Sequence, residues 1–355
     1  MTAVIAGAGQ ERRSGFSSTG GSGTPTLELG SLTTSLWSGG RLQAVVLGLD
    51  LRIDRGEIVG VVGESGSGKT VTVRSIVGAL PSQAMLEGSI RVQGEELVGA
   101  SRRRLREIRG KHIGMIFQDP RAYIDPLWRV GTHMTEGMRT HLGLSRSEAR
   151  QRGIELLGEV GLGHPEQVFH QYPGELSGGM LQRVMIAGAL AVEPTLLLAD
   201  EATTALDVTT QAEIVSLIGQ LRADRGLSVL FITHDLALAS LICDRVCVMY
   251  AGRSVEQREG KGVFYDPRHP YTQGLLAARP DIFRKLDRLK VISGNPTTAM
   301  EAPDGCAFHP RCPYADERCA SEVPTPVAIT GGMARCWRLD QVPRNKAATA
   351  HGDSS

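Results

Sequence analysis

The sequence has almost no net charge, few cysteines and no long apolar run. It has 39 Lys and Arg against 38 Asp and Glu, a formal charge of +1. This balance argues against a general nucleic-acid coat or a polybasic membrane patch. No apolar stretch approaches the ~18 residues that span a bilayer. No basic start precedes an apolar core at the N-terminus, so we do not expect secretion. Six cysteines in 355 residues do not suggest a disulfide scaffold.

What is present is the composition of a globular protein, with 41% hydrophobic and 22% charged residues. Residues 1–26 are rich in Gly, Ser, Thr and Ala, and we expect a disordered leader there and a disordered tail over 344–355. Between them, short apolar runs alternate with longer helical ones, which predicts a mostly parallel α/β sheet. The expected strands are residues 58–62, 113–117, 196–199, 229–233 and 245–250.

A glycine-rich loop follows the first of these strands and opens a predicted helix over 70–80. Residues 63–70 read GESGSGKT, the pattern G-x-x-x-x-G-K-[ST] in the setting that it requires. The glycines let the backbone N–H groups face one concavity, and the helix adds the positive end of its dipole. Lys69 can place a cation on the β- and γ-phosphates, and the Thr70 hydroxyl can bind Mg²⁺. The predicted phosphate-binding residues are Gly63, Glu64, Ser65, Gly66, Ser67, Gly68, Lys69 and Thr70.

Two carboxylates follow the apolar run 196–199, at the strand edge where open α/β sheets bind ligands. Asp200 is placed to hold Mg²⁺, through a water. Glu201 is placed to accept a proton from the attacking water or to orient it. His234 follows the strand 229–233, and Gln118 follows the apolar core of the strand 113–117.

A second anion site is predicted where residues 176–180 read LSGGM at the start of a helical run. Ser177 and the bare amides of Gly178 and Gly179 lie at that helix N-terminus, where anions are favoured. Residues 205–207 read ALD further along the chain.

Together, GESGSGKT, Gln118, LSGGM, LLLADE, ALD and His234 resemble the ATP-binding-cassette (ABC) ATPases in order and spacing, over about residues 27–260. The resemblance implies an α/β P-loop NTPase cassette, with a mixed sheet core, a small β subdomain and a helical subdomain inserted at about 120–180. We expect the cassette to span 27–264 and a separate C-terminal region to span 265–343. Two departures from the usual pattern are Ala202, where many relatives have proline, and the run QDPRAYIDP over 118–126.

The resemblance also implies roles for individual residues. In a sandwich dimer, Ser177, Gly178 and Gly179 would cap the γ-phosphate of the partner's nucleotide, and Asp207 would line the seam. His234 would contact the γ-phosphate within its own subunit. Gln118 would sense Mg²⁺ and the attacking water. An aromatic ring usually stacks on adenine in this family; Trp37 could supply it, and Leu36 could occupy the same site.

The C-terminal region has a pattern of its own. Residues 269–280 read HPYTQGLLAARP, and four later cysteines have the spacing C-x5-C-x6-C-x16-C. The block resembles the C-terminal region of the oligopeptide/dipeptide/nickel branch of ABC importers. Four thiolates suit a soft metal centre, and the resemblance implies a [4Fe–4S] cluster. A zinc site that includes His309, or simply reduced thiols, stays open. The four cysteines are Cys306, Cys312, Cys319 and Cys336. Cys243 and Cys247 are expected to be buried small hydrophobes.

The resemblance implies an ATP hydrolase that energises import, with ATP and Mg²⁺ at its site. The implied partners are a second ATP-binding subunit, homologous or identical to this one, two transmembrane permease subunits and an extracytoplasmic solute-binding protein, with no nucleic acid. The implied location is peripheral, on the cytoplasmic face of the cell membrane. Di- or oligopeptides are the expected cargo, with nickel or a metal chelate as the alternative. Two other functions are less favoured. A non-transport cassette ATPase would show tandem cassettes, a long coiled-coil insertion or a basic tail, and the sequence shows none of these. Intact Lys69, Asp200, Glu201 and His234 argue against a catalytically silent regulatory subunit.

Overall fold

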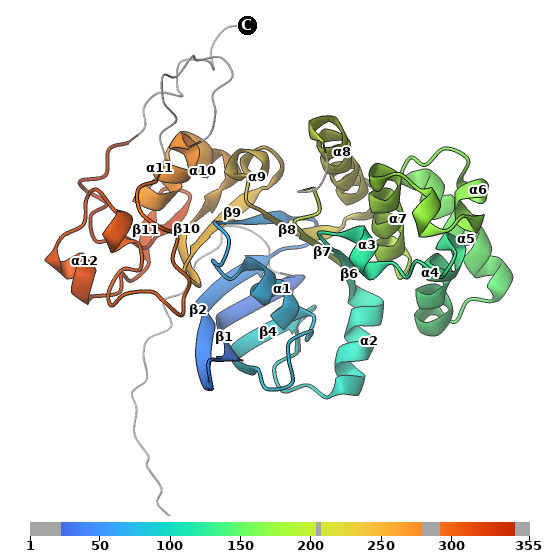
Figure 1. Ribbon diagram of the computed structural model, residues 1–355, viewed down its shortest axis with the longest axis horizontal. Coiled ribbons are helices and arrows are strands. Elements are labelled where there is room, and N and C mark those ends of the chain that lie inside the picture. Colours follow the sequence, from blue (N-terminus) through green and yellow to red (C-terminus); the bar gives the residue numbers. More distant parts are fainter. Residues whose placement is uncertain (1–22, 204–206, 279–291, 345–355) are drawn as a thin grey trace, which may run out of the picture.

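The computed structural model describes residues 23–203, 207–278 and 292–344 (Figure 1). The predicted leader and tail therefore lie almost entirely outside the described residues. The strands are β1 (Leu27–Ser38), β2 (Arg41–Ile53), β3 (Ile58–Val62), β4 (Met85–Val92), β5 (Glu95–Glu96), β6 (Ile113–Ile116), β7 (Leu196–Asp200), β8 (Ser228–Thr233), β9 (Arg245–Tyr250), β10 (Arg253–Glu259), β11 (Val327–Ile329) and β12 (Gly332–Ala334).

Twelve α-helices are found in the described residues. They are α1 (Lys69–Ile76), α2 (Arg102–His112), α3 (Pro120–Tyr123), α4 (Val130–Gly137), α5 (Arg146–Glu159), α6 (Pro165–His170), α7 (Gly178–Leu190), α8 (Val208–Arg225), α9 (Leu236–Ile242), α10 (Gly260–Tyr265), α11 (Pro270–Ala277) and α12 (Glu317–Ser321). Short π- or 3₁₀-helical turns are η1 (Met138–Leu142), η2 (Pro173–Glu175) and η3 (His309–Arg311).

The larger sheet has the strand order β11-β12-β10-β9-β3-β8-β7-β6. The five strands from β9 to β6 run parallel, and they are the five that the sequence predicts. The three remaining strands add to one edge in antiparallel pairing. The sheet is therefore mixed, as the cassette resemblance implies.

The parallel strands are buried on both faces, which explains their continuous apolar runs. Because side chains alternate across a strand, β7 contributes to two cores. On one face of the sheet, Leu197 and Ala199 belong to the core formed with α7, α8 and α9. On the other face, Leu196 and Leu198 belong to the core formed with α1 and the smaller sheet. The carboxyl ends of β7 and β8 are thus held side by side by a closely packed core.

The smaller sheet is antiparallel, with the order β2-β1-β4-β5. The sequence patterns did not predict these strands individually, although the resemblance implied a small β subdomain. β1 has the sequence LELGSLTTSLWS, in which small and polar residues interrupt the apolar alternation, and its register shifts in three places against β2. Such irregular strands give a weak periodic signal.

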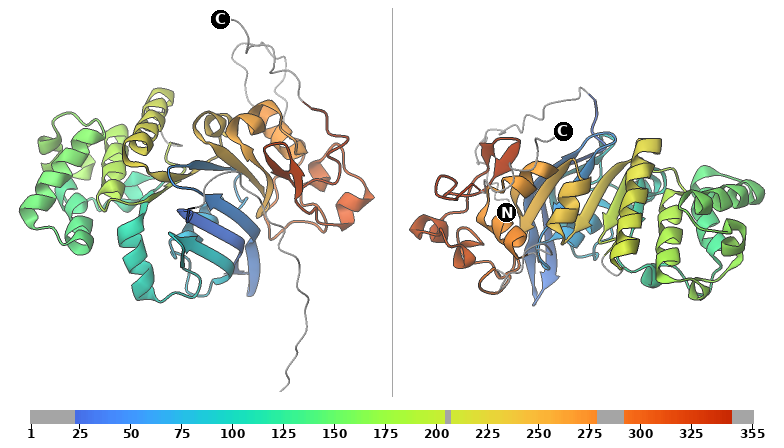
Figure 2. Two further views of the ribbon diagram at one scale, coloured as in Figure 1. Left: turned by 180° about the vertical axis from the view of Figure 1, so that it is seen from behind. Right: turned by 90° about the horizontal axis from the view of Figure 1, so that it is seen from above.

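Helices α4 to α7 lie at one end of the molecule, and the cysteine-containing region lies at the other (Figures 1 and 2). Within the helical group, Ser145 and Glu148 form a capping box that starts α5. Helix α2 carries a basic run whose arginines make exposed ion pairs with Glu95 and Glu107, so it is a solvated helix face. Across the described ranges, each helix is too short or too polar to cross a membrane.

Candidate nucleotide site and cysteine region

The phosphate loop joins β3 to α1, and its backbone curls around a lysine. The Lys69 Nζ donates hydrogen bonds to the carbonyls of Gly63 (2.8 Å) and Glu64 (3.0 Å). Gly63 has no room for a side chain, because a Cβ there would lie 2.2 Å from the Met249 carbonyl oxygen. Gly68 immediately precedes α1 as its N-cap and has φ 102°, a conformation that favours glycine. The loop that the sequence predicts is therefore formed, with its lysine buried at the centre.

Lys69 is only 5% exposed and lies among carboxylates. Burial lowers the pKa of Lys69, while the charges of Glu201, Asp200 and Glu64 oppose that shift. An arriving phosphate group would add further negative charge beside this cation, which favours the charged lysine.

Asp200 and Thr70 lie together and present oxygen atoms of the kind that Mg²⁺ prefers. The Thr70 hydroxyl donates to Asp200 Oδ1 at 3.3 Å. Burial, and then the charge of Glu201, raise the pKa of Asp200, whereas the Thr70 hydrogen bond and the charges of Arg74 and Lys69 oppose the shift. A divalent cation would stabilise the charged form of a carboxylate in these surroundings, so the residues present fit the Mg²⁺ that the resemblance implies.

Glu201 and Gln118 meet although 83 positions separate them in the sequence. The Gln118 amide Nε2 donates to Glu201 Oε2 at 3.1 Å. Glu201 has φ 50°, uncommon for a residue with a side chain, and its N–H donates to the Ile232 carbonyl at 3.1 Å. His234 lies two residues beyond Ile232, at the same sheet edge, and is exposed. This edge thus gathers the predicted catalytic residues.

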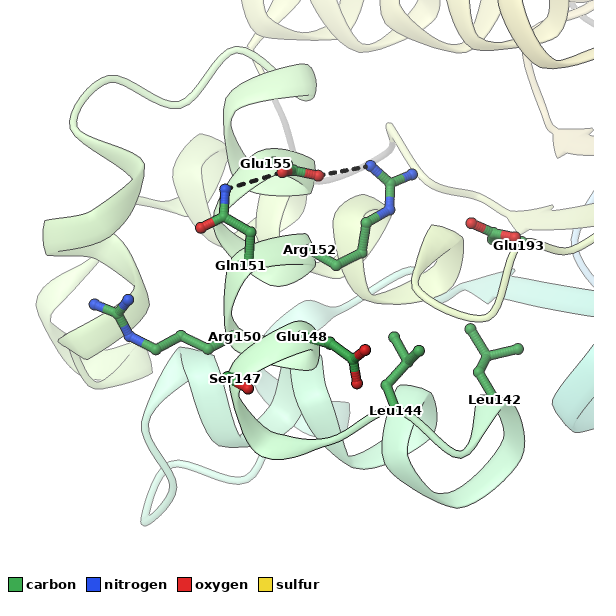
Figure 3. A pocket seen from close by; sticks show the side chains of 9 residues that line it. All are labelled: Leu142, Leu144, Ser147, Glu148, Arg150, Gln151, Arg152, Glu155 and Glu193. Carbon is green, nitrogen blue, oxygen red and sulfur yellow. Dashed lines mark hydrogen bonds and ion pairs between the residues drawn. The ribbon is translucent and has the colours of Figure 1, made fainter.

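A cavity of about 550 Å³ opens beside these residues, with Thr70, Gln118 and Asp200 in its lining. A second, larger and more open cavity of about 840 Å³ lies in the helical group (Figure 3). Its lining includes Leu142, Glu155 and Glu193, and none of the predicted site residues.

The LSGGM segment starts helix α7. Ser177 is the N-cap, and its Oγ accepts a hydrogen bond from the Met180 N–H at 3.3 Å. Ser177 and Gly178 are exposed, and Gly179 is half-buried. The segment thus offers hydroxyl and amide groups outward. Asp207 caps helix α8 by accepting from the N–H groups of Thr209 and Thr210, while the first two residues of the ALD motif lie outside the described residues.

Trp37 lies near the end of β1, opposite Leu42 of β2, and is 58% exposed. Leu36, its neighbour, is half-buried. Because adjacent residues of a strand point to opposite faces, only one of the two can face a bound adenine. The stacking role of Trp37 stays a prediction.

Two residues that touch the phosphate loop were missed by the sequence reasoning. The Glu64 N–H donates to the Tyr271 hydroxyl at 2.8 Å, and the Glu64 carboxylate pairs with Arg311. Both partners come from the C-terminal region. The HPY segment that contains Tyr271 was noticed as a family pattern, but nothing local in either stretch indicates this contact.

The four C-terminal cysteines share one neighbourhood. The Cys306 N–H donates to the Cys319 carbonyl at 2.8 Å. Burial is the main cause that raises the pKa of Cys336 to about 12, and the thiols of Cys312, Cys306 and Cys319 add to the shift. All six cysteines of the chain are free thiols. Cys243 and Cys247 are buried, as predicted.

The cysteine neighbourhood is not a ready-made metal site. In the part of the chain that the structure describes, no three His, Cys, Asp or Glu side chains are grouped so that they could hold a metal ion. The geometry therefore lends no support to the predicted iron–sulfur or zinc centre, which remains a sequence-based proposal.

Comparison with known proteins agrees with this arrangement. The ABC transporter family model matches residues 46–204, and the model of the oligopeptide/dipeptide transporter C-terminal region matches residues 255–319. The oligopeptide transport ATP-binding protein AppD of Bacillus subtilis is 42% identical over 318 residues, which cover 89% of this chain and 97% of AppD. The oligopeptide transport ATP-binding protein OppD of Salmonella typhimurium is 41% identical, covering 82% of this chain and 87% of OppD.

Among solved structures, the dimeric structure of MJ0796, a bacterial ABC transporter cassette, is similar with a TM-score of 0.59 and 28% identity. The match covers 66% of this chain and 98% of that cassette. A second structure of the same cassette is described as a post-hydrolysis state bound to ADP and Pi, with the same score and coverage. The chain therefore belongs to the ATP-binding subunits of ABC transporters, in the branch that carries the oligopeptide/dipeptide transporter C-terminal region.

Proposed function

We propose that this subunit hydrolyses ATP to drive the import of di- or oligopeptides. The observation that carries the proposal is the convergence of Gln118, Glu201, Asp200 and Thr70 at one sheet edge, beside the buried Lys69. The C-terminal region matched over 255–319 and the peptide-transport names of the relatives support a peptide cargo. We propose 27–264 as the ATPase domain and 265–343 as the C-terminal region.

In this proposal, ATP lies between the phosphate loop of one subunit and the Ser177 segment of a second. Lys69 binds the β- and γ-phosphates, and the backbone amides of the loop hold their oxygens. The outward-facing N-terminus of α7 supplies Ser177, Gly178 and Gly179 to the partner's γ-phosphate, which fits its exposure. Trp37 is proposed to stack on adenine.

Glu201 then orients the attacking water and accepts its proton, held by the amide of Gln118. His234 supports the γ-phosphate from the end of the neighbouring strand. Mg²⁺, held by Thr70 and Asp200 with Gln118 nearby, would neutralise charge on the phosphate oxygens. Catalysis in this arrangement comes mainly from positioning and electrostatics.

Exposed apolar residues near Gln118 are suited to meet membrane subunits. Leu127 is 81% exposed, Tyr123 50% and Trp128 43%. These residues lie just after the segment QDPRAYIDP or within it, so a contact there could pass motion to Gln118. We propose that two permease subunits dock here. The subunit would then lie peripherally on the cytoplasmic face of the membrane. A solute-binding protein would deliver the cargo from the other side.

The cargo assignment is tested with the complete importer in vesicles, loaded with its solute-binding protein. A mixture of di- and oligopeptides is expected to raise the ATPase rate severalfold, because bound cargo favours the closed, hydrolysing dimer. Nickel chloride and a nickel chelate serve as the comparison. Stimulation by nickel or its chelate, with no response to peptides, would replace the peptide assignment by the alternative one.

We also propose that Cys306, Cys312, Cys319 and Cys336 hold a [4Fe–4S] cluster, with zinc as the alternative. Protein purified without oxygen is expected to contain about four iron atoms and four acid-labile sulfides per chain. Cys312→Ser should lose this iron, whereas Cys243→Ala, which alters a buried cysteine elsewhere, should keep it. Stoichiometric zinc without iron would refute the cluster.

A further inference from the structure

An arginine of the C-terminal region reaches the phosphate loop across 247 positions of sequence. Arg311 Nη1 donates to Glu64 Oε2 at 2.7 Å, and Nη2 donates to Glu64 Oε1 at 3.1 Å. The two terminal guanidinium nitrogens thus each engage one carboxylate oxygen, which is the strong two-point form of this pair. Glu64 is the second residue of GESGSGKT, so the pair ties the C-terminal region directly to the loop that follows β3.

Arg311 is held in place from several sides. Its side chain is only 4% exposed. Its Nε donates to the Ser293 carbonyl at 3.0 Å, and Nη1 donates to the Tyr250 hydroxyl at 3.3 Å. The guanidinium also lies 5.8 Å from the ring centres of both Tyr250 and Phe308. Because these contacts hold the guanidinium in one orientation, it can hold the Glu64 carboxylate in one orientation as well.

The same region holds the loop at two further points. The Tyr271 side chain is fully buried, and its hydroxyl accepts the Glu64 N–H at 2.8 Å. Thr298 closes against Gly66, because a Cβ on that glycine would lie 3.1 Å from its Cγ2. The C-terminal region therefore contacts both the backbone and the side chain of the loop.

The charge of Glu64 creates a need for this contact. A carboxylate within a loop that receives a triphosphate repels it, and the repulsion grows where water is excluded. Lys69 lies close to Glu64, because its Nζ donates to the Glu64 backbone carbonyl at 3.0 Å. A paired cation at Arg311 removes this repulsion and leaves Lys69 available to the phosphates.

We propose that Arg311 is a positioning residue of the ATP site, which holds and neutralises Glu64 so that the phosphate loop can accept ATP. The C-terminal region, on this view, completes the nucleotide site of its own subunit. The inference rests on the proposed role of the loop in binding ATP.

The test measures KM for ATP and kcat by phosphate release from the complete complex in vesicles. Arg311→Met is expected to raise KM about fivefold to tenfold, which corresponds to about 1.0–1.4 kcal/mol, with kcat changed by less than about twofold. Arg311→Lys, which keeps the charge and loses the two-point contact, should fall between this variant and the wild type. Arg318→Met is the matched control, because Arg318 pairs with Glu322 in an exposed bridge of the same region, and its KM should equal that of the wild type.

The double variant Arg311→Met/Glu64→Gln separates neutralisation from general damage to the fold. Removing the unpaired carboxylate is expected to restore KM to within about twofold of the Glu64→Gln single variant. An unchanged KM in Arg311→Met, or a double variant no better than Arg311→Met alone, would overturn the inference. If Arg311→Met does not assemble, Arg311→Gln and Arg311→Gln/Glu64→Gln replace it under the same two criteria. A wild-type complex that released no phosphate would instead refute the proposed function.

Discussion

Glu201→Gln is expected to abolish ATP turnover while leaving ATP binding intact. The amide keeps the size of the side chain but cannot accept the proton of the attacking water. General-base catalysis contributes about 10²–10⁴-fold to such reactions, so we expect a loss of at least about 100-fold. Because the phosphate loop is unaltered, ATP should still close the dimer, which then stays closed. Single-turnover phosphate release measures the first effect, and size-exclusion chromatography with MgATP measures the second.

A suitable control for this variant is Glu193→Gln. Glu193 lines the cavity of the helical group and not the nucleotide site (Figure 3). Its removal should leave turnover unchanged and should not trap a dimer. Undiminished hydrolysis by Glu201→Gln would remove Glu201 from the mechanism, even if ATP binding were confirmed.

Lys69→Met is expected to weaken ATP binding itself. Methionine fills similar space but brings no cation, so the carboxylates of Asp200 and Glu201 would face the triphosphate with less compensation. Loss of a charged hydrogen bond in a buried site costs up to about 3 kcal/mol, which corresponds to a fall in affinity of about 100-fold. Equilibrium titration with a fluorescent ATP analogue and Mg²⁺ measures this loss directly.

The comparison for Lys69→Met is Lys111→Met, which removes an exposed lysine of α2. This variant should bind ATP as the wild type does. Equal affinity in Lys69→Met and Lys111→Met would contradict the assignment of the loop as the phosphate site. The two site variants also separate two steps, because Glu201→Gln should bind ATP without hydrolysing it, whereas Lys69→Met should lose affinity for ATP itself.

The sequence predicts the parallel core and the loops at its carboxyl edge because their signals are local. Strands β3 and β6–β9 are short apolar runs, and GESGSGKT is a continuous motif. Helix α1 is shorter than the predicted 70–80, because it ends at Ile76 and Gly78 follows with φ 62°. A glycine in this conformation is a common helix stop, and the predicted continuation to residue 80 was wrong.

The contacts between distant segments could not be predicted in this way. Arg311 and Tyr271 reach Glu64 across 247 and 207 positions, and no pattern in either segment indicates the partner. The same holds for the hydrogen bond between Gln118 and Glu201, whose meeting was implied only by resemblance to a known family. These contacts depend on which segments the fold brings together and not on the local sequence around either partner.

In our proposal, cleavage of ATP between this subunit and a second ATP-binding subunit drives import. The most direct measurement follows phosphate release and peptide uptake in the same vesicles, with the complete wild-type importer and with its Glu201→Gln form. We expect both signals to require ATP in the wild type and both to vanish in the variant. A complete wild-type complex that neither retained nucleotide nor released phosphate would contradict the claim.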